Sequence, residues 1–69
     1  MDINVNQIYI WMARRNMNQS DIARKSGLSR KAVSTILIRK TCSPKNLGKI
    51  ANALGVDPGE ITKVQLRGE

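Results

Sequence analysis

Residues 19–40, which read QSDIARKSGLSRKAVSTILIRK, decide the fold because they contain two short helical patterns joined at one glycine. Asn18 precedes the first pattern, and its side chain can accept a hydrogen bond from a free N–H of the first turn. Asp21 places a negative charge in that positively polarised turn. Gly27 can adopt the left-handed conformation that ends a helix. This stretch therefore predicts a short helix that begins and ends with defined caps.

The second pattern begins after Ser29, which is another candidate N-cap. Its apolar residues follow the three- and four-residue spacing of one buried stripe, and they are Val33, Ile36 and Leu37. Two short helices joined by a glycine-containing turn form a helix-turn-helix motif. The second helix of such a motif can enter the major groove of DNA.

The composition fits a small basic domain. The chain has 69 residues, a net charge of +7 and a calculated pI of 10.4, values that favour a polyanionic partner. A solvated surface would explain the charge equally well. The cations are concentrated in a segment whose only acid is Asp21, and they are Arg14, Arg15, Arg24, Lys25, Arg30, Lys31, Arg39, Lys40, Lys45 and Lys49.

Several kinds of protein are excluded or disfavoured. The chain has no histidine and one cysteine, Cys42, which argues against Cys/His metal sites and intramolecular disulfides. It lacks an apolar run of the ~20 residues needed to cross a membrane. Paired carboxylates at helical spacing and a glycine-rich phosphate loop are also missing, so nothing supports catalysis. We expect a soluble, cytoplasmic protein that uses no metal and no cofactor and is not an enzyme.

Three further helical patterns flank the motif. Asp2 or Asn4 can cap the first, Ser43 followed by Pro44 starts the next, and Asp57 with Pro58 starts the last. The sequence predicts an all-α fold with five helices at about 5–16, 19–26, 30–38, 44–54 and 58–64. These helices form one domain over residues 1–64, followed by a frayed tail over 65–69. Trp11 is interpreted as a core anchor rather than a base-stacking residue.

An ordered set of residues resembles the phage-repressor type of helix-turn-helix family (XRE-like), which includes the lambdoid repressor and Cro proteins. The set is Met17-Asn18-Gln19, Ile22-Ala23, Gly27-Leu28-Ser29, Val33-Ser34, Ile36, Pro44 and Ile50 to Val56. The resemblance covers about Val5 to Val64. It implies a compact five-helix, lambda-repressor-like domain. Such domains bind duplex DNA, usually as dimers on a near-palindromic operator, and control transcription.

The sequence departs from the family at two places. Members often carry an arginine and a glutamate as a buried pair where this chain has Met12 and Leu37. Losing both charges together is physically coherent, because an apolar pair can replace a buried ion pair without a stability loss. The glycine that commonly follows the recognition helix is Arg39 here. The end of this helix is therefore expected to differ, and the sequence leaves Ile38 open between core and surface.

The second motif helix supplies the candidate base contacts. With Val33 inward, about 100° per residue places Lys31 and Thr35 almost opposite it, and Ser34 and Ile38 beside them. The resemblance assigns base contacts to Arg30, Lys31, Ala32 and Thr35. Basic side chains can donate to guanine O6 and N7, and a threonine or isoleucine methyl can meet the thymine methyl. The alternative is that all four are solvated surface, and this alternative is strongest for Ala32.

A second group of residues is predicted to contact phosphates, which fixes register without reading sequence. It consists of Asn18, Gln19, Ser29, Ser34, Arg39, Lys40 and Lys45. The resemblance assigns the role of Gln19, at the start of a helix whose free N–H groups favour an anion. Capping alone would explain Asn18. Arg24 and Lys25 are expected on the far side of their helix, exposed to solvent.

The leading prediction is a sequence-specific, double-stranded DNA-binding transcriptional regulator. We expect a Cro-like or small repressor of phage or mobile-element type, without a separate ligand-sensing domain. It would bind as a homodimer with recognition helices about 34–36 Å apart on DNA. The alternative is an antitoxin or protein-interaction module on the same fold, with a protein partner. An apolar surface patch that includes Val56, Ile61 and Val64 would favour it.

Overall fold

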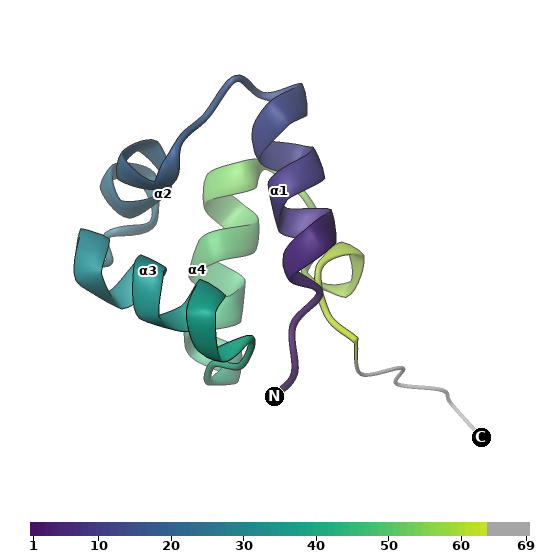
Figure 1. Cartoon of the computed structure of the whole chain (residues 1–69). Helices are drawn as coiled ribbons and strands as arrows, with labels where there is room; N and C mark the ends of the chain where they lie inside the picture. Colours follow the sequence, from purple (N-terminus) through teal and green to yellow (C-terminus); the bar gives the residue numbers. More distant parts are fainter. Residues whose placement is uncertain (64–69) are drawn as a thin grey trace.

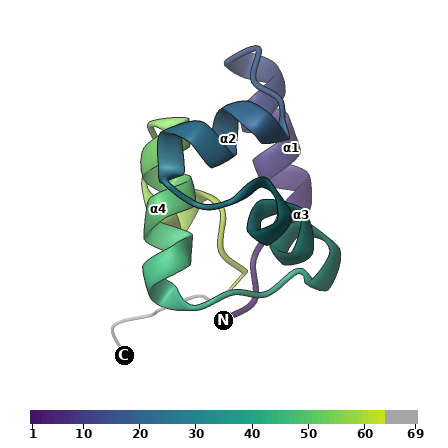
Figure 2. The same cartoon turned by 90° about the vertical axis from the view of Figure 1, so that its left-hand side faces the viewer.

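The structure is a computed structural model, and it describes residues 1–63. Four α-helices make up most of these residues. They are α1 (Val5–Arg14), α2 (Gln19–Ser26), α3 (Arg30–Arg39) and α4 (Pro44–Leu54), followed by a 3₁₀ turn, η1 (Pro58–Glu60). α2 packs against both α3 and α4, and η1 packs against α4. In Figure 1, α2 and α3 lie on the left side of the molecule and α1 lies on the right. In Figure 2, α2 and α3 come to the front.

One apolar core joins all the helices. The largest side chains that are less than 2% exposed are Ile3, Ile8, Ile22, Val33, Ile50, Leu54 and Ile61. Met12 and Leu37 are 6% and 5% exposed, so both residues that replace the charged pair of the family belong to this core. No polar or charged residue of the described chain is buried with them. Apolar packing therefore provides the stability of the interior.

The predicted caps start and end the helices. The side chains of Asn4, Asn18, Ser29 and Ser43 each accept a hydrogen bond from a backbone N–H three residues ahead. Pro44 follows its serine in the first turn of α4, where its missing N–H leaves no helical hydrogen bond unmade. Gly27 and Gly55 end α2 and α4 with φ angles of 80° and 74°. Local sequence thus sets most of the helix boundaries.

The end of α1 differs from the prediction. The helix was expected to continue to Asn16 but ends at Arg14. Asn16 has a φ of 54°, the left-handed conformation that asparagine tolerates better than most residues. The N–H of Met17 then reaches back to the carbonyl of Met12 at 2.8 Å. This cap stops the helix early and directs Met17 toward the core, against which it packs.

The predicted fifth helix, 58–64, does not form as an α-helix within the described residues. Only the 3₁₀ turn Pro58–Glu60 forms, capped by Asp57, whose side chain accepts the N–H of Gly59 at 2.8 Å. Ile61 turns away with a φ of −125°, and its carbonyl accepts the N–H of Asn4 at 2.8 Å. The φ of Ile61 lies outside the helical range, so the described residues do not continue the turn into an α-helix. The last residue expected in that helix, Val64, lies outside the described residues, as does the predicted tail.

The partner of that segment is the N-terminal stretch, residues 1–4, whose role the sequence did not reveal. This stretch forms two isolated bridges, Asp2 with Thr41 and Ile3 with Thr62. It therefore lies between the connection that follows α3 and the segment that follows η1 (Figure 2). The Ile3 side chain is fully buried. The N-terminal stretch thus ties the end of α3 to the end of the described chain.

The end of α3 shows the consequence of Arg39 replacing the family's glycine. The helix runs one residue longer than expected, through Arg39, and the left-handed conformation moves to Lys40, with a φ of 61°. Such a conformation is unfavourable for a lysine. It is held by two hydrogen bonds, from the Lys40 N–H to the Ile36 carbonyl and from the Ile3 N–H to the Lys40 carbonyl. The N-terminal stretch therefore supports this turn.

Candidate nucleic-acid interface

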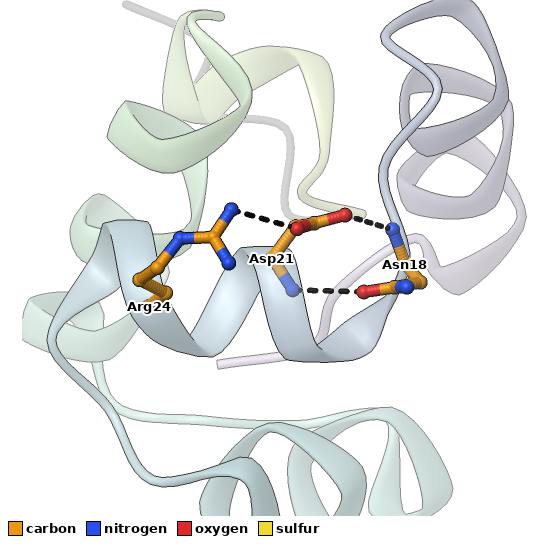
Figure 3. Close-up of polar contacts among 3 residues, drawn as sticks. All are labelled: Asn18, Asp21 and Arg24. Carbon is orange, nitrogen blue, oxygen red and sulfur yellow. Dashed lines mark hydrogen bonds and ion pairs between the residues drawn. The ribbon is translucent and has the colours of Figure 1, made fainter.

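The N-terminus of α2 is closed by a reciprocal capping box, shown in Figure 3. The Asn18 side-chain oxygen accepts the Asp21 N–H at 2.9 Å, and the Asn18 N–H donates to the Asp21 carboxylate at 3.0 Å. The guanidinium of Arg24 donates to the other carboxylate oxygen at 2.8 Å. The Asn18 N–H and then Arg24 hold the pKa of Asp21 below its usual value of 3.8. Asp21 therefore remains ionised over the whole neutral range.

The N-terminus of α3 is built differently. Ser29 caps it by accepting the Ala32 N–H at 3.0 Å, but its first turn contains no acid. Arg30 and Lys31 occupy that turn and are both exposed. Because the N-terminus of a helix carries a partial positive charge, cations there are placed unfavourably for helix stability. An external anion would remove this unfavourable arrangement.

The two sides of α3 have opposite character. Val33, Ile36 and Leu37 face the core and are 1%, 7% and 5% exposed, which confirms the predicted buried stripe. The opposite side carries Lys31 and Thr35, and both are exposed. The buried stripe fixes the rotation of the helix about its axis, so the outward direction of Lys31 and Thr35 is fixed too. Figure 2 looks almost along this axis.

The residues predicted to contact bases all lie in residues 30–35 of α3. Arg30, Lys31 and Thr35 are exposed, whereas Ala32 is half-buried. Their assignment to base contacts stays a prediction. The geometry brings three of them to the surface on the first two turns of α3, the part of a recognition helix that reaches base edges.

The residues predicted to contact phosphates divide into three places. Asn18 and Gln19 lie at the start of α2, Ser29 and Ser34 lie on α3, and Arg39, Lys40 and Lys45 lie around the connection to α4. Gln19 and Ser34 are half-buried and the others are exposed. Asn18 has a capping role, which uses its side-chain oxygen and its backbone N–H. Its side-chain NH₂ group is not used by the cap.

Two of the cations, Arg14 and Arg15, make contacts within the chain. The Arg15 side chain donates to the carbonyl of Leu54 at 3.1 Å, at the C-terminus of α4. Arg14 and Arg15 also lie over the Trp11 ring at 5.0 and 5.2 Å from its centroid. Trp11 is half-buried and packs against the core, as expected for an anchor. The basic segment of the sequence is therefore not one continuous binding surface.

Two features of this surface could not be read from the sequence. The Asp21 carboxylate occupies the α2 N-terminus, so the anion site expected there retains only the donors that the capping box leaves, at Gln19 and Ser20. Ile38 belongs to the surface, with 76% of its area exposed. Helical spacing placed Ile38 beside Lys31 and Thr35, but the replacement of the usual glycine by Arg39 left the end of the helix open in the sequence. The observed helix end, after Arg39, places Ile38 on the surface.

The apolar surface expected for a protein-interaction module is not formed by the described residues. Ile61 is fully buried, Val56 is half-buried against the core, and Val64 lies outside the described residues.

Burial raises the pKa of the half-buried Cys42 thiol. Residues 1–63 contain no group of three or more His, Cys, Asp or Glu side chains that could hold a metal ion. Within the same residues no helix is long and apolar enough to span a membrane.

Comparison with known families agrees with this arrangement. The family model of the Cro/C1-type helix-turn-helix DNA-binding domain matches residues 2–65. The chain therefore belongs to the Cro/C1-type helix-turn-helix DNA-binding family. Membership in this family supports DNA binding as the general function of the domain, and regulation of transcription is the role typical of the family. The comparison with curated proteins found no match.

Two solved structures share the fold. They are native PhpD with cadmium atoms, and PhpD with cadmium complexed with hydroethylphosphonate. Each superposes with a TM-score of 0.77 at 24% sequence identity and covers 97% of this chain. The chain spans 15% of the length of those proteins. At this identity the likeness establishes the fold alone.

Proposed function

We propose that this protein is a sequence-specific double-stranded DNA-binding transcriptional regulator. In this proposal it is a Cro-like or small repressor of phage or mobile-element type, and it acts without catalysis in the cytoplasm of a prokaryotic cell or phage-infected host. The observation that carries the proposal is the cationic, acid-free first turn of α3, held outward by a buried stripe on the opposite side. A major-groove reader needs both of these properties.

The proposed contacts fall into two layers. Arg30, Lys31, Ala32 and Thr35 meet base edges, so that the first two turns of α3 read the sequence. The phosphate contacts come from both sides of the groove, and they are Asn18, Gln19, Ser29, Ser34, Arg39, Lys40 and Lys45. Supporting this division, the cations of the second group lie around one connection, Arg39 to Lys45, whose start is held by the N-terminal stretch. Such a rigid flank suits contacts that set register.

We propose further that two copies bind one near-palindromic operator. A single domain offers about four base-contacting residues, which is a short recognition site. Two copies with α3 helices about 34–36 Å apart would read two half-sites, one turn of the duplex from each other. With three cations in the phosphate group of each copy, the logarithm of affinity should fall with the logarithm of salt with a slope of roughly five.

Selection of bound sequences from random duplex DNA, carried out at two salt concentrations, tests the proposal. We expect one two-fold symmetric motif at both concentrations, with weaker binding at the higher one. Lys45→Ala should weaken every duplex alike and reduce the salt slope by about one per copy. Lys25→Ala, on α2, is the matched control. Salt-sensitive binding without an enriched motif would reduce the function to nonspecific phosphate attraction.

A further inference from the structure

Ile38 is the most exposed large apolar side chain of the described residues. It is 76% exposed, compared with 47% for Tyr9, 44% for Ile10 and 38% for Met1. It lies in the last turn of α3, next to the exposed cations Arg39 and Lys40. Isolated exposed apolar residues are common and need no explanation by themselves. The position of Ile38 relative to the candidate interface gives this one its interest.

Ile38 extends the outward face of α3. At about 100° per residue, seven residues turn the helix almost twice, so Ile38 projects within about 20° of the direction of Lys31. Thr35 lies on the other side of Lys31, about 40° away. The buried residues Val33 and Leu37 project to the opposite half of the helix. Lys31, Thr35 and Ile38 therefore form one stripe, which is polar at its start and apolar at its end.

The chemistry of this stripe selects an occupant for its apolar end. An isoleucine side chain can neither donate nor accept a hydrogen bond, and the apolar group that base pairs present in the major groove is the C5-methyl of thymine. Isoleucine in a helix is largely confined to one χ1 rotamer, so its methyl groups are already positioned. The turn at Lys40 that follows it is held by the Ile3 N–H, so the end of α3 has a defined position.

We infer that Ile38 is a specificity-determining residue that contacts the C5-methyl group of a thymine. Its position seven residues beyond Lys31 is about 10 Å farther along the helix axis. At about 3.4 Å per base pair, this thymine lies roughly three base pairs from the base that Lys31 reads. The inference rests on the proposed function, because it requires α3 to lie in the major groove.

A second copy of the chain would be the other occupant of such an apolar surface. Charge argues against it. Ile38 is followed directly by Arg39 and Lys40, both exposed, and no acid lies on α3. Two copies that meet through Ile38 would bring these cations together, whereas DNA would place phosphates beside them. The surroundings of Ile38 therefore favour DNA.

Deoxyuridine substitution tests the inference, because it removes only the methyl group of thymine. Each thymine of the selected operator is replaced in turn, and binding is measured for the wild type and for Ile38→Ala. We expect the wild type to lose about fourfold in affinity at one thymine per half-site, the effect of one buried methyl-sized group. Ile38→Ala should bind the thymine and deoxyuridine duplexes equally at that position. Ile38→Val should retain part of the difference.

The remaining outcomes separate the inference from the proposed function. If Ile38→Ala shows the same deoxyuridine penalties as the wild type, or the operator has a G·C pair at that position, the inference is wrong while the proposed function stands. If Ile38→Ala weakens all duplexes alike and sedimentation shows fewer copies on each, Ile38 contacts a second copy instead. If selection yields no motif, the proposed function fails and the inference fails with it. Thermal unfolding of Ile38→Ala provides the control for folding.

Discussion

The two helices of the motif are both capped at their N-termini, but the charges in their first turns have opposite signs. α2 begins with a capping box and an acid, Asp21, and its last turn contains the cations Arg24 and Lys25. Each of these charges is on the side that the helix dipole favours. α3 begins with Arg30 and Lys31 and has no acid in its first turn. These two cations are at the end of the helix where the dipole disfavours positive charge, whereas Arg39 in the last turn is at the favoured end.

The difference is the one expected if α2 mainly supports the structure and α3 reads DNA, as proposed above. Local rules of stability are obeyed where a segment only has to fold, and they are broken where a functional site needs something else. α2 obeys them throughout. α3 gives up favourable charge placement at its start and leaves Ile38 exposed near its end, while its inward side is packed as well as that of α2. This contrast supports the proposal that the outward side of α3 is the DNA-reading surface.

The largest expected effect on stability comes from truncating an isoleucine of α2, compared with truncating an isoleucine of α3. Ile22 of α2 is 1% exposed, and Ile22→Ala should lower the free energy of unfolding by about 2–5 kcal/mol. This is a large part of the stability of a domain this small. Ile38→Ala on α3 should change it by less than about 0.5 kcal/mol. Urea unfolding measures both, and similar losses would mean that Ile38 is packed rather than exposed.

A smaller effect is expected at the cap of α2. Asn18→Ala removes the oxygen that accepts the Asp21 N–H and should lower the free energy of unfolding by about 0.5–2 kcal/mol. Asn18→Ser, which can still cap, should keep most of the stability. Thermal or urea unfolding compares the two variants. If they behaved alike, the capping box would contribute nothing and α2 would lose its role as the optimised helix.

The smallest effect concerns pH. Because Asn18 and Arg24 lower the pKa of Asp21 in the folded state, its stabilising contribution is complete above the ordinary carboxyl pKa of 3.8. It is lost as the pH falls through the lower, folded value. Urea midpoints measured between about pH 5 and pH 2 should therefore fall less steeply for Asp21→Asn than for the wild type. Parallel curves for the two proteins would contradict this assignment.

Features that depend on neighbouring residues were predictable from the sequence. The caps at Asn18, Ser29 and Ser43 and the glycine turn at Gly27 occur where predicted, because each requires only a side chain and a backbone within a few residues. The buried stripe of α3 follows from helical spacing in the same way. Helical spacing also predicted that Lys31 and Thr35 face outward, and both are exposed.

Features that depend on distant parts of the chain were not predictable. The fifth helix was expected from Asp57, Pro58 and Glu60, but only a 3₁₀ turn forms there, and the Ile61 carbonyl accepts the N–H of Asn4 from the N-terminal stretch. No local sequence pattern predicts this contact between the two ends of the described chain. Ile38 stayed undecided because the helix end beside it is set by the turn at Lys40, which the Ile3 N–H helps to hold.

The comparison of α2 with α3 can be tested most directly by removing one lysine from each. Binding of Lys31→Ala and Lys25→Ala is titrated at one salt concentration, on the selected operator and on a shuffled duplex. The two variants lose the same charge. We expect Lys31→Ala to lose about 1–3 kcal/mol on the operator and to discriminate less between the duplexes, with Lys25→Ala close to wild type. Equal losses for the two variants on both duplexes would show that charge alone binds DNA and that α3 does not read it.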